Sequence, residues 1–238
     1  MLPENNNSLQ KENRTFKITI DGPAASGKTT TARKVAETLG FLHLDSGSLY
    51  RAATLKVLQT HTPIDDQQAV ADIIRKSTID LITQDGRNKV LLDGIDVTEN
   101  IRLPEISNAV SKIASMVHVR KILSEWQRTI AKSKNIVVEG RDTGTVVFPD
   151  AQLKIFMSAS LEDRVQRRYK ELTAKGVNVD ADQLRREIVQ RDWNDEEREH
   201  SPLKRPDDAI DLDTTNMTID TFREQKGNIR RRGHSQLL

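Results

Sequence analysis

The segment GPAASGKT, from Gly22 to Thr29, constrains the fold more than any other part of this 238-residue sequence. It follows a short apolar run over Phe16–Ile20 and leads into a helical pattern over Lys28–Leu39, which Gly40 ends. Glycines let a backbone turn closely around an anion, and the N-terminus of the next helix adds a favourable field. The pattern G-x-x-x-x-G-K-[ST] in this context predicts a nucleoside triphosphate site.

Side chains in this loop suit a triphosphate bound with Mg²⁺. We expect Lys28 to reach the β- and γ-phosphates and the Thr29 hydroxyl to face the metal. The predicted ATP-binding residues of the loop are Gly22, Pro23, Ala24, Ala25, Ser26, Gly27, Lys28, Thr29 and Thr30. The loop alone does not name the reaction, because GTPases, motor ATPases and small-molecule kinases share it.

Short apolar runs alternate with helical patterns along most of the chain. Further strands are predicted at residues 41–45, 135–139, 152–157 and 209–213. Helices are expected at 46–58, 67–75, 104–114, 119–132 and, with a break near Gly176, at 161–200. This alternation predicts a mostly parallel α/β sheet, whose ligands bind beyond the carboxyl ends of its strands.

Residues 60–115 interrupt the alternation. Two runs with a period of two residues, 78–83 and 89–93, flank Asp85-Gly86, which is a strong signal for a β-hairpin. We therefore expect a small α+β insertion at the edge of the parallel sheet.

Composition limits the partners and the compartment. The net charge of +2 is too weak to indicate nucleic-acid binding, and without cysteine there is neither a disulfide nor a Cys-based zinc site. Residues 1–14 are polar and lack the apolar core of a signal peptide, and no apolar run is long enough for a membrane helix. We expect a cytoplasmic protein that binds neither nucleic acid nor membrane.

Acidic and basic residues follow two other predicted strands. Asp45 is followed by Arg51, and Glu139 by Arg141 and Asp142. Glu139 occupies the place of the acid that helps to orient Mg²⁺ and its waters in P-loop enzymes. The alternative is an ordinary exposed acid at a strand end.

The charged helical stretch repeats basic residues on single helix faces. Two sets share a face: Arg164, Arg167 and Arg168, and Arg191, Asp195 and Arg198. One interpretation is a solvated helix with ion pairs of about 0.3–0.5 kcal/mol each. The other is a mobile lid that carries positive charge onto phosphates and excludes water.

Five stretches together carry a resemblance to the bacterial cytidylate kinases, from about residue 17 to 220. They are ITIDGPAASGKTT, LDSGSLYRA, EGRDTGTVVFPDAQLKIFMSAS, RDWND and LDTTNMTID. The resemblance implies a five-stranded parallel P-loop NTPase core of adenylate-kinase type. It also implies transfer of the γ-phosphoryl group of ATP to CMP or dCMP with Mg²⁺, by a monomer. Residues 60–115 would form the CMP-binding insertion, and about 164–200 the helical lid.

Site residues are carried over by motif. The resemblance assigns CMP binding to Ser46, Arg51, Ser111, Arg120, Arg141, Asp142, Arg191 and Asp195. It places Arg167 and Arg168 near ATP. The catalytic residues would be Lys28, Arg141, Arg167 and Arg191, and Thr29 would bind Mg²⁺ with Glu139 acting through water.

Cytosine chemistry suits two of these residues. The carboxylate of Asp142 can accept from the N4 amino group, whereas Arg120 can donate to N3 and O2. Uracil reverses the donor and acceptor at positions 4 and 3. Hydrogen bonds of this kind can discriminate by up to about 10⁴-fold to 10⁵-fold, so we predict selectivity for CMP over UMP.

Other assignments stay open. The alternatives are a kinase for another small acceptor and a P-loop ATPase or switch protein, although the guanine-reading pattern N-K-x-D does not occur. Residues 1–14 are predicted to be a disordered leader, 15–225 the kinase domain and 226–238 a flexible tail. Trp126 and Trp193 are both expected to pack against neighbouring elements.

Overall fold

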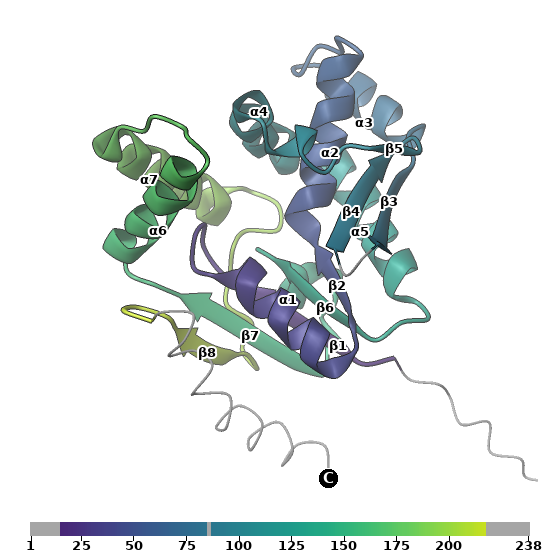
Figure 1. The fold of residues 1–238 in the computed structure, drawn as a ribbon. Helices are drawn as coiled ribbons and strands as arrows, with labels where there is room; N and C mark the ends of the chain where they lie inside the picture. Colours follow the sequence, from purple (N-terminus) through teal and green to yellow (C-terminus); the bar gives the residue numbers. More distant parts are fainter. Residues whose placement is uncertain (1–14, 85–86, 218–238) are drawn as a thin grey trace, which may run out of the picture.

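The computed structural model describes residues 15–84 and 87–217, and the predicted leader and tail lie outside these ranges (Figure 1). Its central sheet has five parallel strands in the order β2-β6-β1-β7-β8. In chain order they are β1 (Lys17–Asp21), β2 (Leu42–Asp45), β6 (Ile136–Gly140), β7 (Leu153–Ser158) and β8 (Ile210–Asp213). The predicted five-stranded α/β fold is confirmed.

Alternate residues of the central strands feed two separate apolar clusters. Ile18, Ile20 and Val137 pack against α1 (Lys28–Leu39). Ile136 and Val138 belong to a larger cluster on the other face, with residues of α2 (Ser46–Gln59) and α5 (Val117–Ala131). A parallel sheet covered on both faces is built from such continuous apolar strands, which explains why short apolar runs marked them.

The segment expected to be an insertion contains α3 (Gln67–Arg75), β3 (Ile79–Gln84), β4 (Arg87–Leu92), β5 (Ile95–Asp96), the 3₁₀ turn η1 (Asn100–Arg102) and α4 (Pro104–Ser115). β3 and β4 pair in antiparallel fashion, which confirms the hairpin, although its turn lies outside the described residues. The third strand, β5, was not predicted, because two residues are too few to show a period. Val70, Ile74 and Ile106 join the larger apolar cluster, so the segment shares its core with the sheet.

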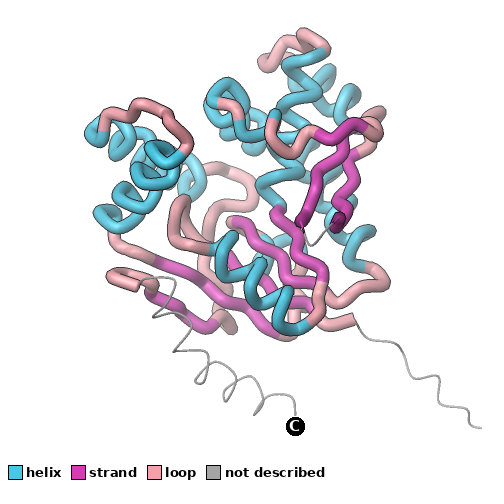
Figure 2. The backbone as a smooth tube through the Cα atoms, in the orientation of Figure 1, coloured by secondary structure: helices cyan, strands magenta, loops and turns pink. Residues whose placement is uncertain are grey.

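α6 (Leu161–Ala174) and α7 (Ala181–Glu197) pack as a pair, and the break at Gly176 is confirmed by its φ of 75°. Figure 2 shows loops joining this pair to the sheet at both ends. α7 ends at Glu197, earlier than the expected His200. In the part of the chain that is described, no helix is both long and apolar enough to cross a membrane. We call α6 and α7 the predicted lid.

Candidate functional site

The phosphate loop joins β1 to α1 at the carboxyl edge of the sheet, and its two glycines meet different demands. A Cβ on Gly22 would lie 2.0 Å from the carbonyl oxygen of Met157, at the end of the neighbouring β7. Gly27 has a φ of 92° and stands at the N-terminus of α1. The loop therefore depends on glycine once for space and once for a left-handed backbone.

Lys28 lies inside this loop, and only 6% of its surface is exposed. Its ammonium donates to the carbonyl oxygen of Pro23 at 2.5 Å and to the Ser26 hydroxyl at 3.3 Å. Burial lowers the pKa of Lys28, and the positive charge of Arg141 lowers it further. A nearby anion would offset both effects, which is the setting expected for a phosphate-binding lysine.

Thr29 and Glu139 meet at the ends of α1 and β6. The exposed Thr29 hydroxyl donates to Glu139 Oε2 at 2.8 Å. Glu139 itself is 3% exposed, so the alternative of an ordinary exposed acid is wrong. A hydroxyl beside a carboxylate is a pair of hard oxygen ligands that fits Mg²⁺, which takes few protein ligands when phosphates supply the others.

Three guanidinium groups gather beyond the same strand ends. Burial lowers the pKa of Arg191 to about 10, and the positive charges of Arg141 and Arg51 contribute to this shift. Arg141 donates to Asp195 at 2.7 Å, and this carboxylate helps to keep its pKa raised although burial opposes that. The cluster combines residues of α2, the β6 edge and α7, and it is an environment that favours an anion.

A second polar cluster lies deeper, with Arg120 and Asp142 paired at 2.5 Å and almost fully buried. Arg198 approaches the same carboxylate at 3.6 Å, and the Arg120 guanidinium lies 5.3 Å from the Tyr50 ring centre. Among the described residues, Tyr50 Oη, Arg120 Nε and Arg198 Nη2 are buried without a hydrogen-bond partner. Buried unpaired polar groups are costly, so a ligand that pairs with them would bind well.

Sequence reasoning noted the face of Arg198 but gave it no role, and it missed Tyr50 altogether. Tyr50 belongs to the motif LDSGSLYRA, yet aromatic residues of helices are more often core than site. Its burial raises its pKa to about 12. Only the approach of α2 to α5, which places the Arg120 guanidinium over its ring, reveals it as part of the polar cluster.

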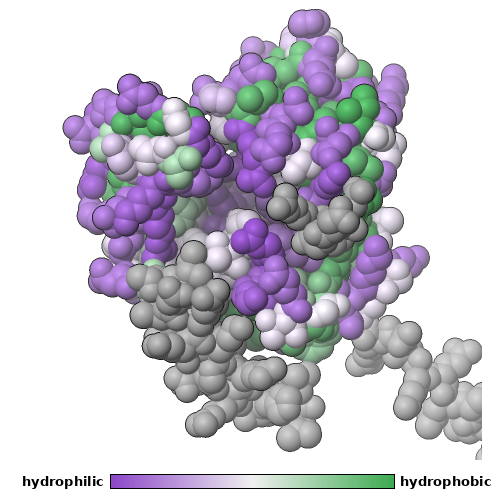
Figure 3. Space-filling view, viewed as in Figure 1, coloured by the Kyte–Doolittle hydropathy of each residue, from purple (hydrophilic) through white to green (hydrophobic). Residues whose placement is uncertain are grey.

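The two remaining predicted acceptor residues, Ser46 and Ser111, have different settings, because Ser46 is buried and Ser111 lines a hollow. The Ser46 hydroxyl donates to the carbonyl oxygen of Glu139 at 2.7 Å. Ser111 of α4 lines a hollow of about 430 Å³ together with Asp195 of α7 and with Arg198, which directly follows α7. Figure 3 shows hydrophilic side chains around the depression between the predicted lid and the rest of the molecule.

Trp193 lies at the rim of that hollow and is 60% exposed, so the expectation that it packs is wrong. It stands two residues from both Arg191 and Asp195, which turns it away from their helix face. Trp126, in contrast, packs against the larger apolar cluster as predicted.

The basic residues of α6 have unequal settings. Arg167 donates to the carbonyl oxygen of Thr214 at 2.5 Å, and a Cβ on Gly27 would lie 4.0 Å from its Nη1. Arg168 pairs with Glu171 at 2.8 Å on the helix surface. Thus Arg167 lies beside the phosphate loop, whereas Arg168 makes the intrahelical pair that a solvated helix would have.

A contact between the predicted lid and the phosphate loop was not predicted. Asp192 of α7 accepts from the Ala24 amide at 3.3 Å and pairs with Arg164 of α6. Arg164 also donates to the carbonyl oxygen of Ala24 at 3.3 Å. Asp192 and Arg164 lie 168 and 140 positions from Ala24 in the sequence, so no spacing rule could have connected them with the phosphate loop.

Asp21, the last residue of β1, was also missed. Its carboxylate accepts from the Thr143 amide at 3.0 Å, the Thr143 hydroxyl at 2.8 Å and the Gly144 amide at 2.7 Å. These bonds fix the start of the π-helical turn η2 (Thr143–Val147), which follows Arg141 and Asp142. Asp21 thereby helps to position the segment that carries Arg141 and Asp142, which are predicted to bind CMP.

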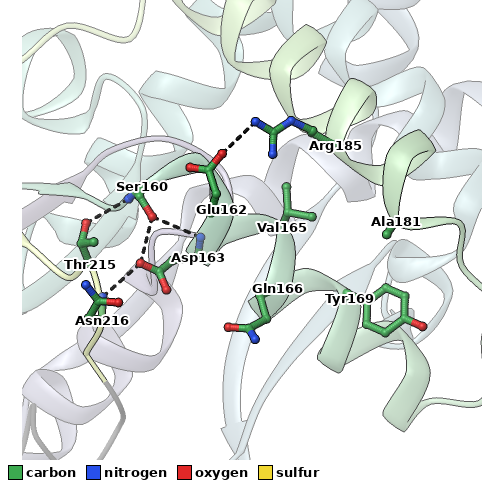
Figure 4. A pocket seen from close by; sticks show the side chains of 10 residues that line it. All are labelled: Ser160, Glu162, Asp163, Val165, Gln166, Tyr169, Ala181, Arg185, Thr215 and Asn216. Carbon is green, nitrogen blue, oxygen red and sulfur yellow. Dashed lines mark hydrogen bonds and ion pairs between the residues drawn. The ribbon is translucent and has the colours of Figure 1, made fainter.

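A larger hollow, about 640 Å³, lies at the base of α6 and contains none of the predicted site residues (Figure 4). Asp163 accepts from the Ser160 hydroxyl at 2.9 Å and from the Asn216 amide at 3.0 Å on one side of it, and Glu162 pairs with Arg185 above. The Ser160 hydroxyl also accepts from the Asp163 amide and so caps the N-terminus of α6. Because none of the predicted site residues lines this hollow, we assign it no part in the chemistry.

Comparison with known proteins identifies the family. The family model "Cytidylate kinase" matches residues 18–228. A cytidylate kinase of Caldanaerobacter subterraneus subsp. tengcongensis is 50% identical over 206 residues, covering 87% of this chain and 90% of that protein. Cytidylate kinases of Carboxydothermus hydrogenoformans (45%, covering 86% and 92%) and Pediococcus pentosaceus (44%, covering 87% and 92%) are similar as well. The chain belongs to the cytidylate kinase family.

Proposed function

We propose that this protein transfers the γ-phosphoryl group of ATP to CMP or dCMP. An oxygen of the acceptor's phosphate attacks the γ-phosphorus, the bond from that phosphorus to the β–γ bridging oxygen breaks, and ADP leaves. The observation that supports this best is the convergence of two cationic groups, one around Lys28 and one around Arg191, at the same edge of the sheet. Such a reaction needs alignment and positive charge rather than a protein nucleophile.

On the donor side, the amides of the phosphate loop and Lys28 would hold the triphosphate. Thr29 and Glu139 would hold Mg²⁺, which neutralises charge on the β- and γ-phosphates when bound. Of the two residues of α6 predicted to bind ATP, Arg167 is better placed than Arg168, because it lies beside Gly27. Arg168 would have to leave its surface pair with Glu171 to take part.

On the acceptor side, Arg51, Arg141 and Arg191 would bind the phosphate of CMP. Burial and the positive charges of neighbouring arginines lower the pKa of Arg51 and Arg191, so a phosphate dianion would stabilise the charged form of both groups. Asp195 would accept from a sugar hydroxyl while it holds Arg141. If that hydroxyl is the 3′-OH, dCMP remains a substrate.

The cytosine base of CMP would bind at the deeper polar cluster, formed around Arg120 and Asp142. Asp142 can accept from the N4 amino group, and Arg120 can donate to N3 or O2. Ser46 and Ser111 would add hydroxyl contacts at the walls of the approach. Closing of the predicted lid would then exclude water as a competing acceptor.

One assay tests the reaction. ADP formation from ATP is measured with CMP, dCMP, UMP or AMP in turn, and without an acceptor. We expect release that depends on CMP or dCMP and on Mg²⁺. Release that prefers AMP or UMP would indicate another nucleotide kinase, and release without an acceptor would indicate an ATPase.

A further inference from the structure

The strand β2 brings a histidine to the acid that we assign to Mg²⁺. His43 Nε2 lies 3.0 Å from Glu139 Oε1, while Glu139 Oε2 accepts from the Thr29 hydroxyl at 2.8 Å. The side chains of His43 and Glu139 are only 9% and 4% exposed. Each oxygen of the carboxylate therefore has its own partner, and the two contacts together hold the plane of the carboxylate.

Donors and acceptors around His43 agree on one arrangement. An ionised carboxylate only accepts, so Nε2 carries the proton and Nδ1 is an acceptor. The Asn88 amide nitrogen lies 3.2 Å from Nδ1 and also donates to the carbonyl oxygen of His43 at 3.1 Å. These contacts define the tautomer and the orientation of the ring.

Asn88 belongs to β4, in the segment between residues 60 and 115. A continuous series of side chains thus runs from that segment through His43 and Glu139 to Thr29 at the start of α1. It connects the expected CMP-binding part of the molecule with the expected metal-binding part.

We propose that His43 is a positioning residue, which orients Glu139 beside Thr29 so that both can serve Mg²⁺, and that Asn88 holds His43 in place. This inference rests on the proposed function. Side chains that hydrogen-bond to metal-binding carboxylates and imidazoles commonly tune metal affinity, and their loss weakens metal binding or activity by roughly 10-fold to 100-fold.

The test uses a matched pair of substitutions at one position. In His43→Gln the side-chain amide reaches as far as Nε2 does, whereas in His43→Asn it reaches only as far as Nδ1. The readout is the affinity of Mn²⁺ for the complex of the enzyme with a non-hydrolysable ATP analogue, measured by electron paramagnetic resonance. We expect about 10-fold weaker binding for His43→Asn and near wild-type binding for His43→Gln.

Kinetics adds a second readout that a purely structural role would not change. The Mg²⁺ concentration for half-maximal rate should rise in His43→Asn, while the KM for CMP stays within about twofold. Asn88→Ala should show the same shift to a smaller extent. His118→Asn, on the exposed side of α5, is the control and should match the wild type.

Equal Mn²⁺ affinity in His43→Asn and His43→Gln would overturn the proposal, including the case in which both variants merely melt earlier. If His43→Asn does not fold, unchanged Mn²⁺ affinity in Asn88→Ala would overturn it instead. A wild-type enzyme without CMP-dependent turnover would refute the proposed function. The Mn²⁺ measurement would still report on His43 by itself.

Discussion

The sheet edge and the predicted lid bring cations to the same space by different means. At the sheet edge, the cationic side chains of Lys28 and Arg120 are enclosed by strands and helices that share two apolar clusters. In α6 and α7, the buried residues are only Arg164, Leu184 and Ile188. The predicted lid is attached largely by polar contacts, such as Asp192 with Ala24. Polar contacts can be exchanged for phosphate contacts, whereas a packed core cannot, and this favours motion of the lid over motion of the sheet.

The largest effect on turnover is expected at the sheet edge, where the cations are enclosed by the packed core. Lys28→Ala should lower turnover on the order of 10³-fold or more, because one preorganised cation is lost at the transferring group. The fold should persist, since a buried ammonium contributes little to stability. Steady-state ADP formation and thermal unfolding measure both, and near-normal turnover would contradict the assigned role.

Asp142→Ala tests the deeper polar cluster. We expect kcat/KM for CMP to fall about 10²-fold or more, because the acceptor for the N4 amino group is gone. Preference for CMP over UMP should shrink with it, since uracil no longer meets a repelling carboxylate. Competition assays with both nucleotides give the ratio. A variant that rejects UMP as strongly as the wild type would refute base reading by Asp142.

Asp192→Ala addresses the attachment of the predicted lid. Breaking a partly buried ion pair and its amide contact should cost about 1–3 kcal/mol locally, so amides of α6 and α7 should exchange hydrogen about 10-fold faster. Exchange in β1 and β6 should not change. Mass spectrometry of exchanged peptides separates the two regions, and uniform acceleration would argue against a separate, weakly held lid.

The smallest effect concerns Tyr50 and pH. Its pKa is about 12 in the folded protein and about 10 in an unfolded chain, so folding favours the protonated phenol. The corresponding stability is present below pH 10 and is lost as pH rises toward 12. Near pH 11 the free energy of unfolding of the wild type should have fallen by about 1.4 kcal/mol through this group, whereas Tyr50→Phe has no phenol to titrate and should not show this loss. Denaturant unfolding of both proteins below pH 10 and near pH 11 measures these free energies. An equal loss of unfolding free energy in the wild type and in Tyr50→Phe would contradict the prediction.

Much of the architecture could be read from local patterns. The phosphate loop is identified by its glycines, Lys28 and Thr29, because a loop of that kind needs those residues at fixed spacing. Helix ends moved by only a few residues, as at α5, which begins at Val117 rather than Val119. Terminal turns carry weak signals, so such shifts are expected.

Contacts between distant segments could not be read in the same way. His43 meets Glu139 across 96 residues, and Asp192 meets Ala24 across 168. Nothing in the immediate neighbourhood of either residue indicates its partner. Trp193 shows the opposite error, because a large apolar side chain in a helical pattern suggested packing where α7 leaves it exposed.

By itself, the sequence determined the phosphate loop, the five-stranded parallel sheet and the family. The loop and the sheet depend on short-range periodicity and on backbone conformations that few residue types allow. The family followed instead from five stretches that resemble the bacterial cytidylate kinases. Only the tertiary structure decided that Glu139 contacts both Thr29 and His43, how Arg51, Arg141 and Arg191 come together, and what holds α7 to the loop. Distance and burial set the strength of charge and hydrogen-bond interactions, and neither quantity exists until the chain has folded.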